Sequence, residues 1–106
     1  MDKQTEMIMS LIVNGGNARS LAMQAIYAAK KGNFDEASQK LLECNDFLLK
    51  AHHGQTELLT KEASGEKTEI TLLMIHAQDH LMNAITVKDL AIEIVDLYKN
   101  KENNHD

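Results

Sequence analysis

The sequence predicts an all-helical protein, and three features of its 106 residues indicate this fold class. The chain contains no proline, and it is rich in Ala, Leu, Ile, Met, Glu and Lys, most of which favour helices. Only two Tyr and two Phe are present, whereas β-sandwiches and barrels use many aromatic residues. A chain of this length supports one hydrophobic core, so we expect a single all-α domain over residues 1–106.

Two glycine-containing breaks divide the chain into three predicted helices. Residues 30–33 read Lys-Lys-Gly-Asn, and cations followed by glycine are typical of a helix end. Asn33, with Glu36 three residues later, resembles a capping box that starts the second helix. Residues 64–67 form the second break, after which Thr68 is the expected N-cap of the third helix. We expect helices near residues 4–31, 34–63 and 68–100, followed by a frayed polar tail at 101–106.

Within each predicted helix, small and apolar residues recur at an alternating spacing of three and four. This heptad pattern is typical of long antiparallel helices packed in a bundle. The Gly15-Gly16 pair stands in mid-helix, where each glycine costs about 1 kcal/mol relative to alanine, so we expect a kink or a tight contact there. The three stripes are Ile8, Leu11, Gly15, Ala18, Ala22, Ala25 and Ala29; Ala37, Leu41, Cys44, Leu48, Ala51, Gln55 and Leu58; and Ile70, Met74, Ala77, Leu81, Ala84, Ala91 and Val95, the last broken only by Lys88.

The third predicted helix is apolar on more than one face. A second stripe, through His76, Val87 and Ile94, lies roughly 100° around the helix from the first. A helix that is apolar nearly all round is usually buried on more than one side. In a unit of only three helices, this pattern predicts self-association.

Composition and charge exclude several classes of function. The net charge of −5 and the single arginine, Arg19, argue against nucleic acid as a partner. The polar start is no secretory signal, and no apolar run approaches the ~18 residues that span a bilayer. Cys44, the one cysteine, has no internal disulfide partner and is expected to be a small buried hydrophobe. We expect a soluble cytoplasmic protein with no direct membrane insertion.

In the first half of the third predicted helix, the second stripe carries ionisable and polar side chains in place of apolar ones. At 100° per residue, His76, Asp79, His80 and Asn83 fall within an arc of about 100°. The i, i+4 spacing of His76 and His80 suits two imidazoles on one metal ion. However, Ala77 stands where zinc proteases carry their general-base Glu, and Asp79 lies about 100° from His80 around the helix.

A second interpretation makes His76 a nucleophile. A neutral imidazole nitrogen accepts a phosphoryl group when an acceptor such as Asp79, Gln78 or a group from another helix holds its other nitrogen. The sequence has no glycine-rich phosphate loop, so the phosphoryl group would arrive on another protein. A third interpretation makes His76 and His80 polar spacers that set the register of a helical seam. For His52 and His53 we expect a structural role, with one facing the core and one facing solvent.

Five short motifs occur in order over nearly the whole chain, and together they match one family. They are Gly16-Asn17-Ala18-Arg19; Gly32-Asn33-Phe34; Ala51-His52 with Gln55-Thr56; Gly65-Glu66; and His76-Ala77-Gln78-Asp79-His80-Leu81-Met82. With these motifs the sequence resembles the IIA components of the lactose/cellobiose class of the bacterial phosphoenolpyruvate-dependent sugar phosphotransferase system.

The resemblance implies an antiparallel three-helix unit that assembles as a homotrimer, nine helices in all. It also implies a phosphotransferase component with a phosphohistidine intermediate on the tele nitrogen of His76. The donor in this family is the histidine phosphocarrier HPr, and the acceptor is the cysteine of a cognate IIB component. The relay serves uptake and phosphorylation of a β-linked disaccharide of the cellobiose/chitobiose or lactose class. Ala77 is closer to the cellobiose/chitobiose branch, since the lactose branch tends to have glycine there.

The resemblance assigns further roles within the same motif. Gln78 and His80 match supporting positions, and Asp79 matches a residue at the trimer axis associated with a shared divalent cation such as Mg²⁺. These roles fit the residues themselves, because an apolar third helix supplies a trimer seam and three clustered carboxylates need a cation or protons. The residues also leave open a non-enzymatic helical oligomerisation or adaptor module, with His76 and His80 as structural spacers. A metal-dependent hydrolase is the third interpretation.

Overall fold

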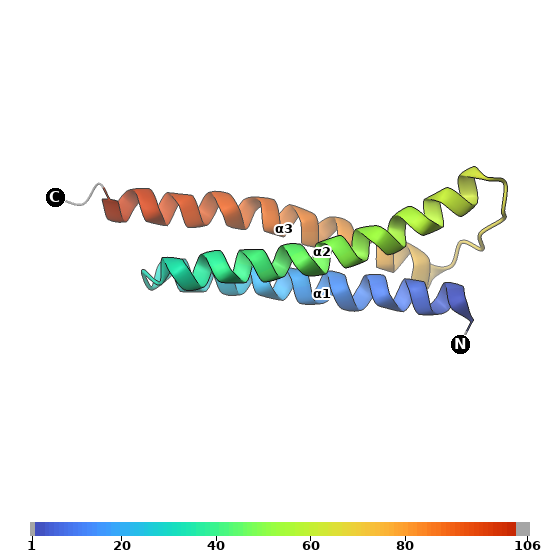
Figure 1. The fold of residues 1–106 in the computed structure, drawn as a ribbon, viewed down its shortest axis with the longest axis horizontal. Helices are drawn as coiled ribbons and strands as arrows, with labels where there is room; N and C mark the ends of the chain where they lie inside the picture. Colours follow the sequence, from blue (N-terminus) through green and yellow to red (C-terminus); the bar gives the residue numbers. More distant parts are fainter. Residues whose placement is uncertain (1, 104–106) are drawn as a thin grey trace.

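Three long antiparallel helices make up the protein in a computed structural model that describes residues 2–103 (Figure 1). They are α1 (Lys3–Lys30), α2 (Phe34–Ala63) and α3 (Leu72–Asn103). No strand occurs in the described part of the chain, so the predicted all-α class is confirmed. The bundle is elongated, at 61 × 23 × 20 Å. None of its described helices has an apolar stretch sufficient to cross a bilayer.

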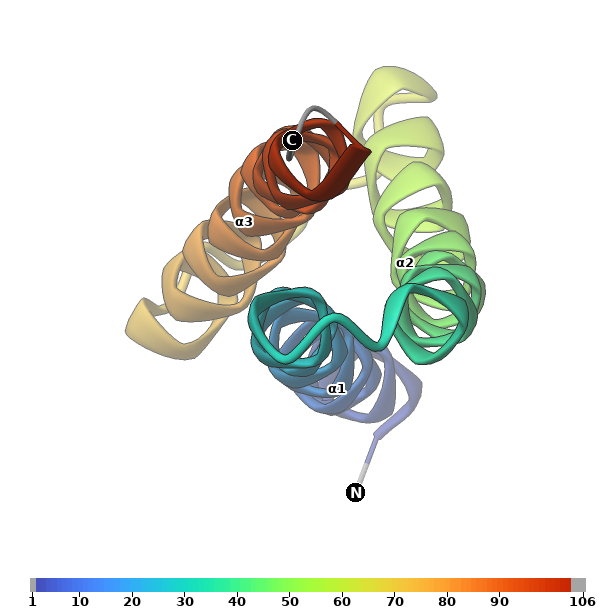
Figure 2. The same cartoon turned by 90° about the vertical axis from the view of Figure 1, so that its left-hand side faces the viewer.

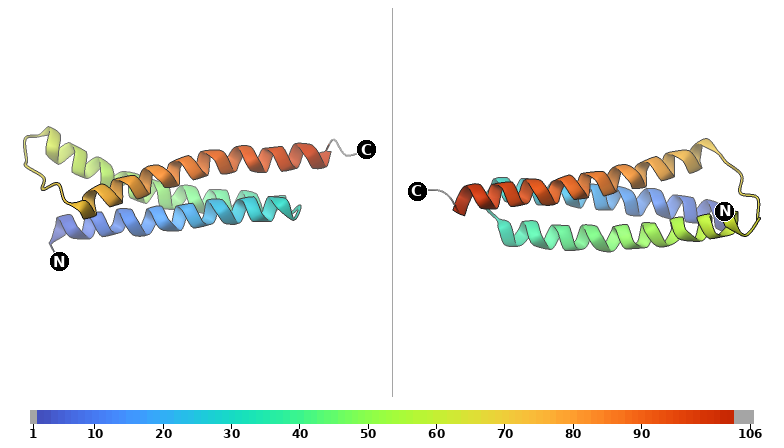
Figure 3. Two further views of the ribbon diagram at one scale, coloured as in Figure 1. Left: turned by 180° about the vertical axis from the view of Figure 1, so that it is seen from behind. Right: turned by 90° about the horizontal axis from the view of Figure 1, so that it is seen from above.

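Helix α1 is the central element of the bundle. It packs along both α2 and α3, which contact each other far less (Figure 2). Towards its C-terminal end α2 rises away from α1, and an extended segment then returns the chain to α3 (Figures 1 and 3). The start of α3 is therefore held mainly against α1.

Both predicted glycine breaks end a helix by the same hydrogen-bonding motif. Gly32 adopts a φ of 81°, which only glycine reaches without strain, and its amide donates to the carbonyl of Ala29 at 3.0 Å. The next amide, of Asn33, donates to the carbonyl of Ala28 at 2.9 Å. This pair of bonds is the Schellman motif, and Gly65, with a φ of 91°, ends α2 in the same way.

Two helix starts differ from the predicted caps. Asn33 does precede α2, but its side chain makes no capping hydrogen bond. Its backbone takes part in the Schellman motif of α1 and, at φ −90° and ψ 72°, is not in the extended conformation of a capping residue. At α1 the cap was not predicted: the carboxylate of Asp2 accepts from the amide of Thr5 at 2.7 Å.

The predicted start of α3 at residue 68, with Thr68 as its cap, is wrong. Residues 66–71 are non-helical, because the chain needs this length to return from the raised end of α2 to α1. Helix α3 begins at Leu72, and the Thr71 hydroxyl caps it by accepting from the amide of Met74 at 3.1 Å. At its other end α3 runs to Asn103, beyond the predicted end at 100, and residues 104–106 of the predicted tail lie outside the described residues.

The heptad stripes of the three helices form most of the core. Ile70 is the clear exception: it is 71% exposed, because it precedes α3. Cys44 is fully buried, as predicted, and its burial among apolar side chains raises the pKa of its thiol. The core residues that confirm the stripes are Ile8, Leu11, Ala18, Ala22, Ala25 and Ala29 of α1; Ala37, Cys44, Leu48, Ala51 and Leu58 of α2; and Ala77, Leu81, Ala84, Ala91 and Val95 of α3.

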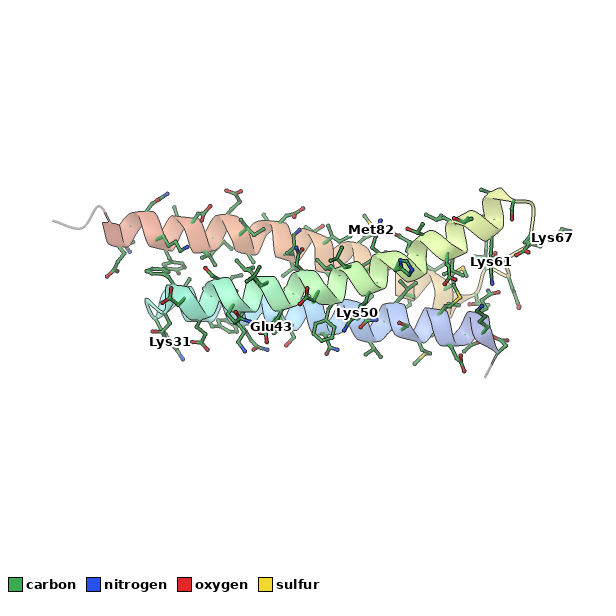
Figure 4. All side chains as sticks on the ribbon, in the orientation of Figure 1. Lys31, Glu43, Lys50, Lys61, Lys67 and Met82 are labelled. Carbon is green, nitrogen blue, oxygen red and sulfur yellow. The ribbon has the colours of Figure 1, made fainter. Side chains whose placement is uncertain are left out.

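A large apolar surface remains outside this core. On α3 it includes Leu72, which is 82% exposed, and Leu97, which is 68% exposed. Charged side chains cover other parts of the surface, as Lys31 and Lys61 do near opposite ends of the bundle (Figure 4). The other large exposed apolar side chains of α2 and α3 are Leu42, Leu49, Leu59, Leu73, Ile75, Met82, Leu90 and Ile92.

Candidate functional site

The predicted site residues all lie in the first three turns of α3, on a backbone that the core holds in place. They are His76, Gln78, Asp79 and His80. Ala77 lies among them and Leu81 directly follows them in sequence, and both are fully buried against the rest of the bundle. This anchoring directs the flanking side chains away from the core. His76 is exposed and His80 is half-buried, so a single chain does not bury His76 as a polar spacer in a seam.

The two imidazole rings of the site are stacked. The ring centroids of His76 and His80 lie 5.7 Å apart, and the ring planes are inclined by only 27°. His80 also lies directly over α1 at the glycine pair: a Cβ built on Gly16 would approach its Nε2 to 3.1 Å. The tight contact predicted at the glycine pair is therefore made to a histidine of the site.

A polar hollow adjoins the half-buried histidine. It has a volume of about 390 Å³ and is lined by Arg19 of α1 together with His80, Asn83, Thr86 and Val87 of α3. Arg19 is exposed there, and it is the only arginine in the chain. In the sequence Arg19 belongs to a motif and to the charge argument but is not predicted as a site residue, although a sole arginine one helical turn from a glycine pair is a signal for one.

Gln78 faces α2 and not the histidines. Its side-chain carbonyl oxygen accepts a hydrogen bond of 2.7 Å from the amide nitrogen of Gln55. The expectation that Gln78 or Asp79 holds the second ring nitrogen of His76 is not met, because no hydrogen bond joins them within the described residues. Gln55, which the sequence gives as a stripe position and as part of a family motif, links α2 to the site segment.

Asp79 occupies a different groove from the histidine hollow. It is exposed, and it lines an apolar groove of about 330 Å³ between the divergent ends of α2 and α3. The apolar residues that line this groove are Leu58, Leu59, Ile70, Met74 and Ile75. Among the described residues, no three His, Cys, Asp or Glu side chains cluster as metal ligands.

His52 and His53 differ from their prediction. Both are exposed on α2, whereas one was expected to face the core. The reason is their position in the heptad: Ala51 and Leu58 take the buried positions of this face, and the two histidines fall between them.

The fold and the site define an all-helical domain that presents a stacked histidine pair at its surface. The chain belongs to the family described as the lactose/cellobiose-specific IIA subunit of the phosphotransferase system (PTS), whose model matches residues 6–99. This confirms the resemblance seen in the sequence. As a member, the chain is a IIA component, one of the phosphotransferase components of that sugar transport system.

Curated relatives match over most of their own length. The lichenan-specific phosphotransferase enzyme IIA component of Bacillus subtilis is 58% identical over 98 residues, 92% of this chain and 89% of the relative. The galactose-specific EIIA component of Lactococcus lactis subsp. cremoris is 54% identical over 94 residues, 89% of this chain and 81% of the relative.

Solved structures show the same fold. The PTS cellobiose-specific enzyme IIA from Bacillus anthracis superposes with a TM-score of 0.96 at 52% identity, covering 99% of this chain and 96% of that one. The IIA(chitobiose) chain of an Escherichia coli IIA(chitobiose)–HPr complex superposes with a TM-score of 0.83 at 34% identity, covering 96% of this chain and 99% of that one.

Proposed function

We propose that this chain is a phosphocarrier that accepts a phosphoryl group from phospho-HPr on His76 and passes it to the cysteine of a IIB component. The observation that carries the proposal is the exposure of His76 on a backbone fixed by the buried residues Ala77 and Leu81. A partner can reach the ring, while the core holds its helix in one position. The likeness to a IIA(chitobiose) chain solved with HPr supports HPr as the donor.

The proposed chemistry is two in-line transfers. The lone pair of the His76 tele nitrogen, Nε2, attacks the phosphorus carried by HPr; the new N–P bond forms as the N–P bond on the HPr histidine breaks. In the second transfer the thiolate of the IIB cysteine attacks, an S–P bond forms, and His76 regains its lone pair. Positioning supplies most of the catalysis in such transfers. The stacked ring of His80 and the backbone anchors supply that positioning here.

The sugar class is proposed from the relatives. Their names refer to lichenan, cellobiose, lactose, galactose and N,N'-diacetylchitobiose. We propose that the relay serves uptake and phosphorylation of a β-linked disaccharide, of the cellobiose/chitobiose or lactose class, and that the chain works in the cytoplasm. Sugar specificity then belongs to the membrane component, during whose transport the sugar itself accepts the phosphoryl group from the IIB cysteine.

We further propose that three copies assemble through the apolar surface of α3 and the groove beside it. Leu72, Ile75 and Leu97 are each more than half exposed in one chain, and their burial between copies is favourable by about 25 cal/mol per Å² of apolar surface. At a threefold axis Asp79 would bring three carboxylates together. A Mg²⁺ ion shared by the three copies of Asp79 would offset their repulsion. Sedimentation equilibrium tests the assembly: a monomer at micromolar concentration would contradict it.

Phosphorylation of the purified chain tests the phosphocarrier proposal. With phosphoenolpyruvate, enzyme I and HPr, we expect one acid-labile phosphate per chain. His76→Gln should abolish labelling, because glutamine lacks the nucleophilic ring nitrogen. His53→Gln is the matched control, since His53 is also exposed but lies on α2, and this variant should label fully. Full labelling of His76→Gln would overturn the assignment, and an unlabelled parent chain would favour an adaptor role.

A further inference from the structure

The glycine pair in α1 has no explanation in the helix itself. Gly15 and Gly16 stand in the middle of a 28-residue helix, where glycine is a poor helix former and alanine the best. Neither residue adopts a positive φ, so the backbone conformation does not require glycine. Something outside α1 must therefore need the space that a Cβ would fill.

That space is filled by one side chain. A Cβ on Gly16 would lie 3.1 Å from His80 Nε2 and 4.0 Å from His80 Cε1, and it would meet no other residue within 4 Å. A Cβ on Gly15 would lie 3.3 Å from His80 Cδ2, closer than ordinary van der Waals contact. Its distances to the backbone, 3.6 Å to Leu81 Cα and 3.7 Å to the His80 carbonyl carbon, are ordinary. The imidazole, and not close approach of the two helices, is what needs the missing methyl groups.

Gly15 and Gly16 form a seat for the His80 imidazole, and His80 in turn contacts His76. Because the imidazole of His80 lies on bare backbone, one edge of the ring faces α1 and the ring is half-buried. Its other neighbour is the ring of His76, stacked at 5.7 Å between centroids. A shift of His80 by a few tenths of an ångström away from α1 would therefore change the stacking of the two rings.

We propose that Gly16, together with Gly15, is a positioning residue for phosphoryl transfer: the absence of a Cβ seats His80, and His80 in turn orients the His76 ring. This inference rests on the proposed role of His76 as phosphoryl acceptor. It explains why α1 keeps two consecutive glycines at the expense of helix stability.

The test compares Gly16→Ala with Gly54→Ala. Both changes replace a mid-helix glycine by the best helix former. Gly54→Ala should raise the melting temperature by a few degrees, whereas in Gly16→Ala the displacement of His80 offsets the gain in helix propensity. The Cβ on Gly54 would lie 3.7 Å from Leu11 Cδ2, in ordinary contact, and it would not contact His76 or His80. Only Gly16→Ala displaces His80, so any difference in function between the two variants reports on the seat.

The first readout is the rate of phosphoryl acceptance from phospho-HPr. A 1 Å misplacement costs up to about 100-fold in rate, so a displacement of a few tenths of an ångström should lower kcat for Gly16→Ala by roughly 10-fold. KM for phospho-HPr should be unchanged, because the docking surface is intact. In a His80→Ala background, Gly16→Ala should have no further effect, since the ring that it displaces is gone. An unchanged kcat, or the same loss without His80, would overturn the proposal.

The second readout does not depend on phosphorylation. In the unphosphorylated protein, the nuclear Overhauser effect between the ring protons of His76 and His80 should weaken in Gly16→Ala and persist in Gly54→Ala. An unchanged signal would refute the seat even if His76 is the acceptor. Conversely, failure of the parent chain to accept phosphate removes the proposed function while this measurement still decides whether Gly16 positions the histidines.

Discussion

The hydrogen bond between Gln55 and Gln78 should contribute about 1 kcal/mol to stability, and a double-mutant cycle can measure it. The amide nitrogen of Gln55 donates to the carbonyl oxygen of Gln78 at 2.7 Å, between two half-buried side chains on different helices. A neutral hydrogen bond of this kind contributes about 0.5–1.5 kcal/mol net. Gln55→Leu or Gln78→Leu alone leaves one amide group half-buried without its partner, so each should destabilise by about 1 kcal/mol. The double variant replaces both partners by apolar side chains and should cost little more than either single change.

Urea denaturation at one fixed protein concentration is the assay, because self-association would make stability depend on concentration. With an m-value of about 2 kcal/mol/M, each single variant should lower the midpoint by roughly 0.5 M. Gln39→Leu, an exposed glutamine on α2, is the control for the generic effect of the change. The coupling energy should be about 1 kcal/mol; a value below about 0.3 kcal/mol would mean that the pair does not hold α2 to the site segment.

Four further outcomes follow from the structure. Asp79→Leu should strengthen self-association in metal-free buffer, because it removes clustered carboxylates; weaker association by sedimentation would point to a hydrogen-bonded Asp79 instead. Leu81→Ala should lower the free energy of unfolding by about 3 kcal/mol, since Leu81 is fully buried, and a loss under about 1 kcal/mol in urea would contradict that burial. Cys44→Ser buries a hydroxyl in an apolar core and should cost about 1–3 kcal/mol, and the native thiol should react with thiol reagents only on unfolding. The hydrogen bond from the Thr5 amide lowers the pKa of Asp2 below 3.8, so its stabilisation of α1 is present above that pH and is lost as pH falls through the lowered pKa. Faster amide exchange at Thr5 in acid would show this loss, relative to amides in mid-α1.

Much of the fold could be predicted from the sequence because the signals were local. Heptad spacing selects which residues of a helix face inward, so positions such as Cys44 and Ala84 were correctly predicted as core. Glycine at the end of a run of helix formers predicts the left-handed conformation, and Gly32 and Gly65 both adopt it. The start of α3 was missed because Thr68 and Thr71 are equally good caps in isolation. Only the distance that the chain must cross decides between them.

For the site, too, some features could be predicted from the sequence and others depend on the tertiary structure. The motif at residues 76–80 and its spacing along one helix were visible in the sequence, and they led to the family to which the chain belongs. The partners of those side chains come from other helices, and no spacing within α3 reveals them. Packing alone brings Gln55 to Gln78 and seats His80 on Gly16. Periodicity acts within one helix and is written in the sequence, whereas contacts between helices depend on their relative placement, which only the tertiary structure decides.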